Sequence, residues 1–246
     1  ITNTTDLTAQ VGYGQDTIDW YHLQPATDGT IIIDISNLHP NGQRSSGIGK
    51  ITIYNATLDP LTQLANNVLK ANENVADSIA VIGGSSYYLV FNTVIAQAAP
   101  YQTKLIFIPD IGEPNNDLAQ AYPLDLNIEI KASIGFNADA QDWYALKMPA
   151  TGLFDFTLTN AQLTGVNNNS LDDIILYNTN LSPLTSILSN TLEPGINSTS
   201  SFIPVYEDET YFININALQT LKNGLFAAPY TFRTSLETIT VTDIGE

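Results

Sequence analysis

The stretch TYFINI, residues 210–215, alternates between side chains that suit the two faces of a β-strand. Tyr211, Ile213 and Ile215 fall on one face, and Phe212 falls on the other. A period of two over a short run rich in aromatic and β-branched residues predicts a half-buried strand, with one face toward an opposing sheet.

Similar short runs recur along the chain between clusters of Gly, Pro, Asn and Asp. Up to residue 109 they predict strands at 6–11, 18–23, 30–35, 50–54, 78–82, 87–91 and 102–108. The remainder repeats the series, from 127–136 to 231–236. About seven or eight strands per half, with turn signals between them and no helical period, predict an all-β fold of antiparallel β-sandwiches.

The two halves of the chain are internal repeats. Asp19-Trp20-Tyr21 recurs as Asp142-Trp143-Tyr144, a displacement of 123 residues. The same displacement relates Gly12 to Gly135, Gly29 to Gly152, Tyr54-Asn55 to Tyr177-Asn178, Pro60-Leu61-Thr62 to Pro183-Leu184-Thr185, and Tyr88 to Tyr211. The displacement then grows, since Ala99-Pro100-Tyr101 matches Ala228-Pro229-Tyr230. The repeat predicts two tandem modules, 1–109 and 110–246.

Composition and charge exclude several classes of function. The chain has 8 Lys and Arg against 25 Asp and Glu, a formal net charge of −17. Because such a surface repels phosphate backbones and anionic lipids, we expect no nucleic-acid partner. The apolar runs are far shorter than the roughly 20 residues that span a bilayer, so we expect no membrane insertion. Without cysteine there is no thiolate nucleophile and no zinc–thiolate site.

The sequence contains no constellation that predicts catalysis. Both histidines, His22 and His39, lie in the first module, and His22 aligns with Ala145 in the second. The Gly-Gly-Ser-Ser turn at 83–86 lacks the strand-to-helix setting of a nucleophile elbow. Acidic pairs such as 172–173 are more typical of solvated loops than of glycosidase pairs. We therefore expect that the protein is not an enzyme.

A set of motifs runs through the second module in a fixed order. They are Glu113-Pro114-Asn115-Asn116-Asp117, Asp139 with Asp142-Trp143-Tyr144, Pro149-Ala150 with Gly152, Asp173 with Leu176-Tyr177, Glu209 with Tyr211, and Pro229-Tyr230. Their order and spacing resemble the bacterial pre-peptidase C-terminal (PPC) family, to which the collagen-binding domains of bacterial collagenases are similar. The resemblance covers the second module and all of the first except its acidic leader. It implies jelly-roll-like sandwiches without catalytic residues and a role in binding, spacing or assembly.

Oxygen-bearing side chains of the second module favour a calcium site, because Ca²⁺ takes about six to eight oxygen ligands. These side chains belong to Glu113, Asn115, Asn116, Asp117, Asp139 and Asp142. The resemblance implies that the two segments meet, since collagenase modules of this type hold calcium between the acidic leader and the loop before the Asp-Trp-Tyr strand. It leaves open which of Asn116 and Asp117 binds. A solvated linker with Asx turns is the alternative interpretation.

Trp20 and Trp143 stand at equivalent positions of the two modules, beside Tyr21 and Tyr144. One interpretation is an exposed platform that stacks on carbohydrate or binds collagen. The other is that each Trp is a core residue of the same sandwich. Because the Trp is repeated in one register, we expect both to lie in the core.

The acidic leader of the second module, at 110–123, suggests how subunits join. At a displacement of 123 residues Ile1 corresponds to Leu124, so the leader has no counterpart before the first module in this sequence. The stretch Asp243-Ile244-Gly245-Glu246 repeats the start of the leader at 110–113. We expect these residues of one subunit to fill the leader site of the next. A segment cut from a longer tandem array explains the repeat equally well.

In such a contact Glu246 would lie near Asp16 and Asp19, the counterparts of Asp139 and Asp142. Three gathered carboxylates repel one another unless a cation lies among them, so we expect assembly to depend on calcium. Strand addition near Ile239 and Val241 would supply directional hydrogen bonds.

Together these features predict a noncatalytic, exported structural protein, located outside the cell or on its surface after removal of an export signal. Its modules would assemble head to tail into a fibre or surface layer, with other copies of the chain as partners and Ca²⁺ as the cofactor. The alternative is a tandem targeting or adhesion module of a secreted hydrolase or surface protein, which binds extracellular polysaccharide or protein.

Overall fold

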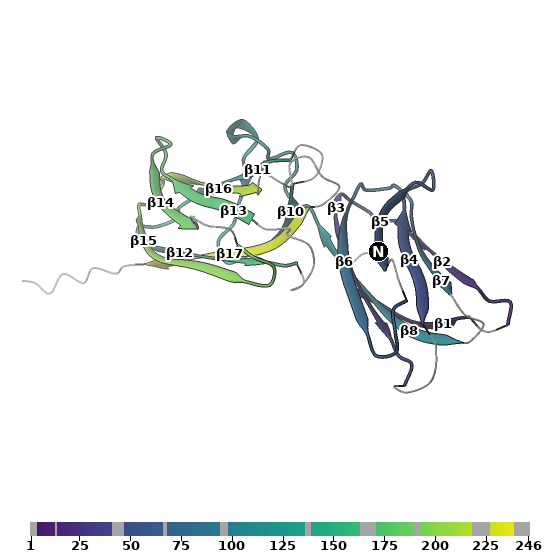
Figure 1. Cartoon of the computed structure of the whole chain (residues 1–246). Helices are drawn as coiled ribbons and strands as arrows, with labels where there is room; N and C mark the ends of the chain where they lie inside the picture. Colours follow the sequence, from purple (N-terminus) through teal and green to yellow (C-terminus); the bar gives the residue numbers. More distant parts are fainter. Residues whose placement is uncertain are drawn as a thin grey trace, which may run out of the picture. The chain divides into compact units, whose positions relative to one another are not determined.

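The computed structural model describes residues 4–12, 14–40, 47–65, 68–93, 98–135, 139–162, 171–188, 192–217 and 227–238. The chain divides into two compact units, with the main boundary between Pro109 and Asp110, and we call them module 1 and module 2. Both consist almost entirely of strands (Figure 1). Within the described ranges, no helix is long and apolar enough to cross a membrane.

Module 1 has two antiparallel sheets of four described strands each. The first has the order β1 (Thr4–Val11), β8 (Ala99–Pro109), β3 (Gly29–Asn37), β6 (Asn74–Val81). The second has the order β2 (Ile18–Leu23), β7 (Tyr87–Thr93), β4 (Ile48–Tyr54), β5 (Pro60–Ala65). Apolar side chains of both sheets form one core, so the sheets pack face to face as a β-sandwich (Figure 1).

Module 2 repeats this architecture and adds one short strand. Its first sheet has the order β10 (Glu129–Ile134), β17 (Ala228–Thr238), β12 (Gly152–Asn160), β15 (Asn197–Val205). Its second has the order β14 (Pro183–Leu188), β13 (Leu171–Tyr177), β16 (Thr210–Ala217), β11 (Gln141–Lys147), β9 (Tyr122–Pro123). The additional strand, β9, pairs in parallel with β11 and follows the 3-10 helix η1 (Leu118–Gln120).

The all-β sandwich predicted from the sequence is confirmed in both modules. In β16 the alternation places Tyr211, Ile213 and Ile215 in the core, with at most 1% of each exposed, while Phe212 is half-buried on the other face. The prediction missed β5 and its counterpart β14. Each begins with a proline at the edge of its sheet and pairs with a bulged register, so neither has a clean period of two.

The register of the repeat needs one correction. Because Leu23 pairs with Tyr87 and Leu146 pairs with Tyr211, the structural counterpart of Tyr211 is Tyr87, not Tyr88. Their hydroxyls make the same contact, since each accepts from the backbone N–H five residues earlier in the chain. The displacement therefore increases from 123 to 124 before β7 and β16, a step that the two adjacent tyrosines conceal in the sequence.

Gly29 and Gly152 start the central strands β3 and β12, where a neighbouring backbone passes too close for a side chain. A Cβ atom would lie 2.3 Å from the Ile108 carbonyl oxygen at Gly29, and 2.3 Å from the Glu237 carbonyl oxygen at Gly152. Both clashes are with backbone and cannot be relieved by rotating a side chain. The repeated glycine is thus explained by close strand packing.

We predict that Gly29→Ala and Gly152→Ala each lower the free energy of unfolding of their module by about 1–3 kcal/mol, because the strand must shift to admit the methyl group. Urea denaturation of the full chain measures the effect. Thr157→Ala, at an exposed position of β12, serves as the control. Glycine variants that match this control in stability would contradict the explanation.

Candidate functional site

The leader of module 2 is attached to the outer edge of β11. The Trp143 backbone N–H donates to the Asn115 carbonyl oxygen at 2.8 Å, and the Leu124 N–H donates to the Ala145 carbonyl oxygen at 2.8 Å. β9 lies between these contacts in sequence and extends the sheet. The leader therefore satisfies the backbone groups that an edge strand would otherwise leave unpaired.

The first turn of the leader rests on the other sheet. Asp110 Oδ1 accepts from the Ser133 N–H on β10 at 3.1 Å. Gly112 has a φ of 110°, and a Cβ there would lie 3.0 Å from the Tyr122 ring. Only glycine adopts this conformation without strain, so Gly112 allows the chain to turn toward β11.

Three carboxylates gather where the leader meets the loop before β11. Asp110, Glu113 and Asp139 each offer an oxygen, and these atoms all lie within 4.8 Å of one another. Glu113 and Asp139 belong to the set expected from the sequence, whereas Asp110 was missed as a ligand candidate. Its signal was the repeated Asp-Ile-Gly-Glu motif, which begins with this residue.

Asp142 is fully buried near this cluster, where it is hydrogen-bonded to one tyrosine that contacts a second. The Tyr230 hydroxyl donates to Asp142 Oδ2, and the hydroxyls of Tyr230 and Tyr144 lie 2.6 Å apart. The Tyr144 hydroxyl is also hydrogen-bonded to the side-chain amide of Asn115, which is 1% exposed. The four side chains form one buried network that links both sheets to the leader.

The side-chain amide of Asn115 connects this network to the carboxylates. In the orientation that satisfies both of its polar atoms, the amide nitrogen donates to Asp142 Oδ1 at 2.8 Å and to Glu113 Oε1 at 2.8 Å. The amide oxygen then lies beside the Tyr144 hydroxyl.

The gathered carboxylates of Asp110, Glu113 and Asp139 repel one another unless a cation or shared protons lie among them. The side chains at the site are the carboxylates of Asp110, Glu113, Asp139 and Asp142 and the amide of Asn115, and oxygens of these types are the ligands that Ca²⁺ prefers. No nitrogen or sulfur ligand is among these five side chains, so the site fits a hard cation better than zinc.

Burial and the neighbouring carboxylates raise the pKa of two of these groups, Asp139 and Asp142. Burial, followed by the charges of Asp110 and Glu113, raises the pKa of Asp139 from 3.8 to about 8. Burial and the neighbouring carboxylates also raise the pKa of Asp142 well above its usual value, although the hydrogen bond from Tyr230 opposes this. A divalent cation that enters the site would displace these protons.

The sequence left open whether Asn116 or Asp117 is the candidate ligand, and the structure places these two side chains differently. Asp117 is exposed and caps η1, where its carboxylate accepts from the Gln120 N–H at 3.1 Å. Asn116 lies beside the cluster, because its amide nitrogen donates to Glu113 Oε2 at 3.1 Å while its Oδ1 is buried without a partner among the described residues. Asn116 is thus the better-placed candidate of the two.

Module 1 carries the same network without a leader among its described residues. The Tyr101 hydroxyl donates to Asp19 Oδ2 at 2.6 Å and lies 2.7 Å from the Tyr21 hydroxyl. The Gly12 N–H donates to the Asp16 carbonyl oxygen, as the Gly135 N–H does to that of Asp139. Asp16 is exposed, and Asp19 and Tyr21 are half-buried, whereas their counterparts Asp142 and Tyr144 are fully buried.

The candidate assembly residues Ile239, Val241, Asp243, Ile244 and Glu246 lie outside the described residues. The structure therefore describes only the other side of the expected contact, which includes Asp16 and Asp19 of module 1.

The expectation that both tryptophans lie in the core is wrong for Trp20, which is 50% exposed. It projects from the outward face of β2, because the inward positions of this edge strand are taken by Asp19, Tyr21 and Leu23. Trp143 is half-buried and contacts Tyr177, with ring centroids 5.5 Å apart. Trp is therefore repeated at an outward position of equivalent strands and not at a core position.

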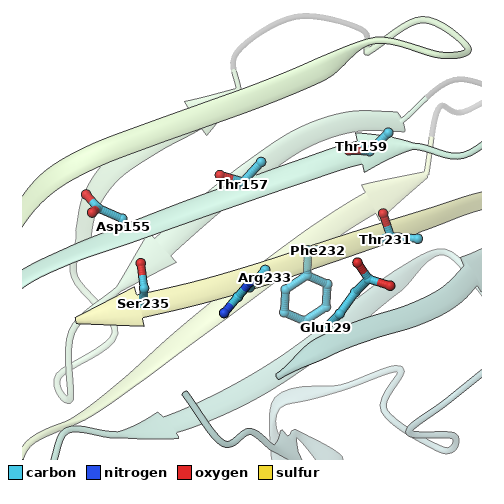
Figure 2. A pocket seen from close by; sticks show the side chains of 8 residues that line it. All are labelled: Glu129, Asp155, Thr157, Thr159, Thr231, Phe232, Arg233 and Ser235. Carbon is cyan, nitrogen blue, oxygen red and sulfur yellow. The ribbon is translucent and has the colours of Figure 1, made fainter. Parts of the chain in front are cut away.

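A polar groove of about 280 Å³ lies on the outward face of β10, β12 and β17 (Figure 2). It is lined by Glu129, Asp155, Thr157, Thr159, Thr231, Phe232, Arg233 and Ser235. Figure 2 shows Arg233 between the two acidic side chains. Because both signs of charge are present, electrostatics favour neither an anion nor a cation in this groove.

No protein-family model and no curated protein matches the sequence. Among solved structures, the pre-peptidase C-terminal domain of collagenase from Bacillus anthracis is similar at 20% identity and a TM-score of 0.31, covering 43% of this chain and 90% of that one. The extracellular domain of ANXUR2 from Arabidopsis thaliana is similar at 8% identity and a TM-score of 0.29, covering 96% of this chain and 89% of that one. The CUB1-EGF-CUB2 domain of human MASP-1/3 is similar at 8% identity and a TM-score of 0.25, covering 94% of this chain and 99% of that one. The collagenase domain belongs to the family that the motifs resemble, but none of these values assigns a function.

We predict that metal-free module 2 loses stability as the pH rises. Because the folded pKa of Asp139 is about 8 and its unfolded value is 3.8, the folded state binds more protons across that range, and the free energy of unfolding falls as pH increases through it. Urea denaturation in chelator, followed by Trp143 fluorescence in a Trp20→Phe background, measures this dependence. Asp139→Asn should flatten the slope. Stability that rises with pH over this range would contradict the prediction.

Proposed function

We propose that the chain is a noncatalytic, exported structural protein whose two sandwich modules join copies head to tail into an extracellular fibre or surface layer. In this proposal Ca²⁺ occupies the acidic site of module 2 and clamps its leader onto the sandwich. The observation that carries the proposal is the contrast between two equivalent sheet edges, one covered and one open.

The covered edge is β11, which pairs with β9. The open edge is β2, which pairs only with β7 within the described part of module 1. Because β2 and β11 have the same register to their inner neighbours, the Trp20 N–H and the His22 carbonyl correspond to the groups of Trp143 and Ala145 that bind the leader. An unpaired edge of this kind is a template for a segment of another chain.

The open edge also carries the receiving half of the acidic site. The network of Asp19, Tyr101 and Tyr21 is formed in module 1 even though its acid is only half-buried. A leader that docked there would bury these groups, as the leader of module 2 buries Asp142 and Tyr144. The covered site of module 2 is thus a model for the contact, and the half-buried site of module 1 is a model for the acceptor before the contact forms.

The donor in this proposal is the stretch 243–246 of another copy, which repeats 110–113 residue for residue. Asp243 would take the place of Asp110, whose carboxylate accepts from β10. Glu246 would take the place of Glu113 and approach Asp16 and Asp19. Ile239 and Val241 would add strand-type contacts beside them.

A contact between the end of one chain and the start of another is heterologous. Such contacts do not close on themselves unless the rotation forms a ring, and they otherwise produce filaments. The added carboxylates would need a counter-charge, so assembly would depend on a divalent cation.

We predict that Ca²⁺ titrated into chelator-treated protein gives a calorimetric heat, and that Asp142→Asn and Asp110→Asn each weaken binding by about tenfold or more. Asp117→Asn is the matched control, because an exposed cap should leave the affinity unchanged. The absence of heat in the parent protein would exclude the calcium site. A loss of calcium affinity in the Asp117→Asn control would indicate that Asp117 is itself a ligand.

We predict further that the full chain forms polymers in Ca²⁺ and dissociates in chelator, as seen by negative-stain microscopy and sedimentation. Deletion of 239–246 should abolish polymers and preserve both folded modules, because β17 ends at Thr238. Glu237→Gln, an exposed acid just upstream, serves as the control and should polymerise like the parent. Polymers formed by the deletion variant would contradict the proposed contact.

A further inference from the structure

We propose that the outward face of the β2-β7-β4-β5 sheet in module 1 binds a neutral polysaccharide by stacking sugar rings on aromatic side chains. The binding surface consists of Trp20, His22, Tyr54 and Tyr88, which we call the aromatic face. This inference is independent of the proposed assembly, because it uses side chains that project from the sheet rather than the backbone edge of β2.

The pairing of the strands places these side chains on one surface. His22 pairs with Tyr88, which pairs with Tyr54 across three strands. Trp20 belongs to the neighbouring row of outward positions, where it pairs with Val90. The ring centroids of Trp20 lie 6.1 Å from those of both Tyr54 and Tyr88, and the His22 and Tyr88 centroids lie 5.4 Å apart. The four rings therefore form one continuous cluster.

The rings lie over the sheet rather than standing apart from it. Val90 and Thr52 occupy outward positions in the row of Trp20, yet they are only 1% and 0% exposed. The larger side chains around them must cover them. Trp20 itself remains 50% exposed, and it belongs to a contiguous aromatic patch of the kind that marks binding sites.

Module 2 shows that this exposure is not a general feature of the fold. At the position of His22 it has Ala145, and at the position of Tyr88 it has Phe212, which has no hydroxyl group. Its Trp143 is half-buried, and the indole N–H is buried without a partner among the described residues. The exposed and polar version of the face is therefore specific to module 1.

The two rows of paired positions that carry the aromatic face indicate the class of ligand. The two rows across the four strands contain His22, Tyr88, Tyr54, Pro60, Trp20, Val90, Thr52 and Gln63, and none of these is Asp, Glu, Lys or Arg. The chain as a whole has a net charge of −17, which repels polyanions. Aromatic faces with neutral hydrogen-bonding groups suit a neutral sugar, whose C–H groups stack on rings while its hydroxyls bond to polar atoms.

A polar rim is present for those hydroxyls. His22 Nε2 and Ser86 Oγ lie 2.9 Å apart at one end of the face, and the Tyr54 and Tyr88 hydroxyl groups are carried by the rings themselves. Four partly exposed rings present roughly a few hundred Å² in total. A protein partner usually needs about 800 Å² on each side, so the narrow aromatic face suits a linear chain of sugars better than a protein surface.

Affinity electrophoresis of the full chain tests the proposal with hydroxyethylcellulose, glucomannan, arabinoxylan and laminarin in the gel, and with pull-down on chitin powder. We expect at least one of these neutral polysaccharides to bind. Trp20→Ala and Tyr88→Ala should each weaken that binding by about tenfold, as the loss of a central aromatic contact does. Tyr206→Ala, which removes a 59% exposed tyrosine of module 2, is the matched control and should bind like the parent.

Two further measurements keep the test decisive. Trp20→Leu retains apolar cover over Val90 but has no ring, so it should also lose binding even if Trp20→Ala proves unstable. In a Trp143→Phe background, saturating polysaccharide should shift the emission of Trp20. The proposal is overturned if none of the neutral polysaccharides binds, if only alginate or only gelatin binds, or if the Trp20 variants bind like the Tyr206 control.

Discussion

The burial of one carboxylate, Asp142, is the constraint on which module 2 depends. A buried acid must receive hydrogen bonds, share a proton or face a cation, because an isolated charge in the protein interior is too costly. Tyr230 supplies one hydrogen bond from the opposite sheet, and the leader brings the amide of Asn115 and further acids to the other side. The leader is therefore part of the fold of module 2 and not a linker that passes over it.

Module 1 shows the same constraint in a relaxed form. Asp19 and Tyr101 reproduce the contact between acid and tyrosine, but Asp19 is only half-buried. One site in two states of completion connects the fold to the proposed function. In the proposed function, an acid that is already positioned and a strand edge that has no partner among the described residues would lower the free-energy cost of receiving a segment from another copy.

β2 has a double role in these proposals because a strand presents two kinds of surface. Its backbone groups lie in the plane of the sheet, where an added strand would bind, and its side chains stand perpendicular to that plane. Trp20 and His22 lie on the outward face, and not in the plane in which a segment would be added to the sheet. A structural subunit could in this way also hold a polysaccharide without a conflict between the two contacts.

The sequence by itself determined the all-β class, the tandem repeat and most strand positions, because these follow from local period and from similarity between distant segments. It also proposed Glu113, Asp139 and Asp142 as members of one site, and these side chains lie close together in the structure. It did not identify Asp110, β5, the counterpart of Tyr211 or the exposure of Trp20. Each of these depends on which strands become neighbours: pairing sets the register, the edge position exposes Trp20, and the turn at Gly112 carries Asp110 to the other acids. Only the tertiary structure decides such matters, because burial and proximity are properties of the packed chain and not of any one segment.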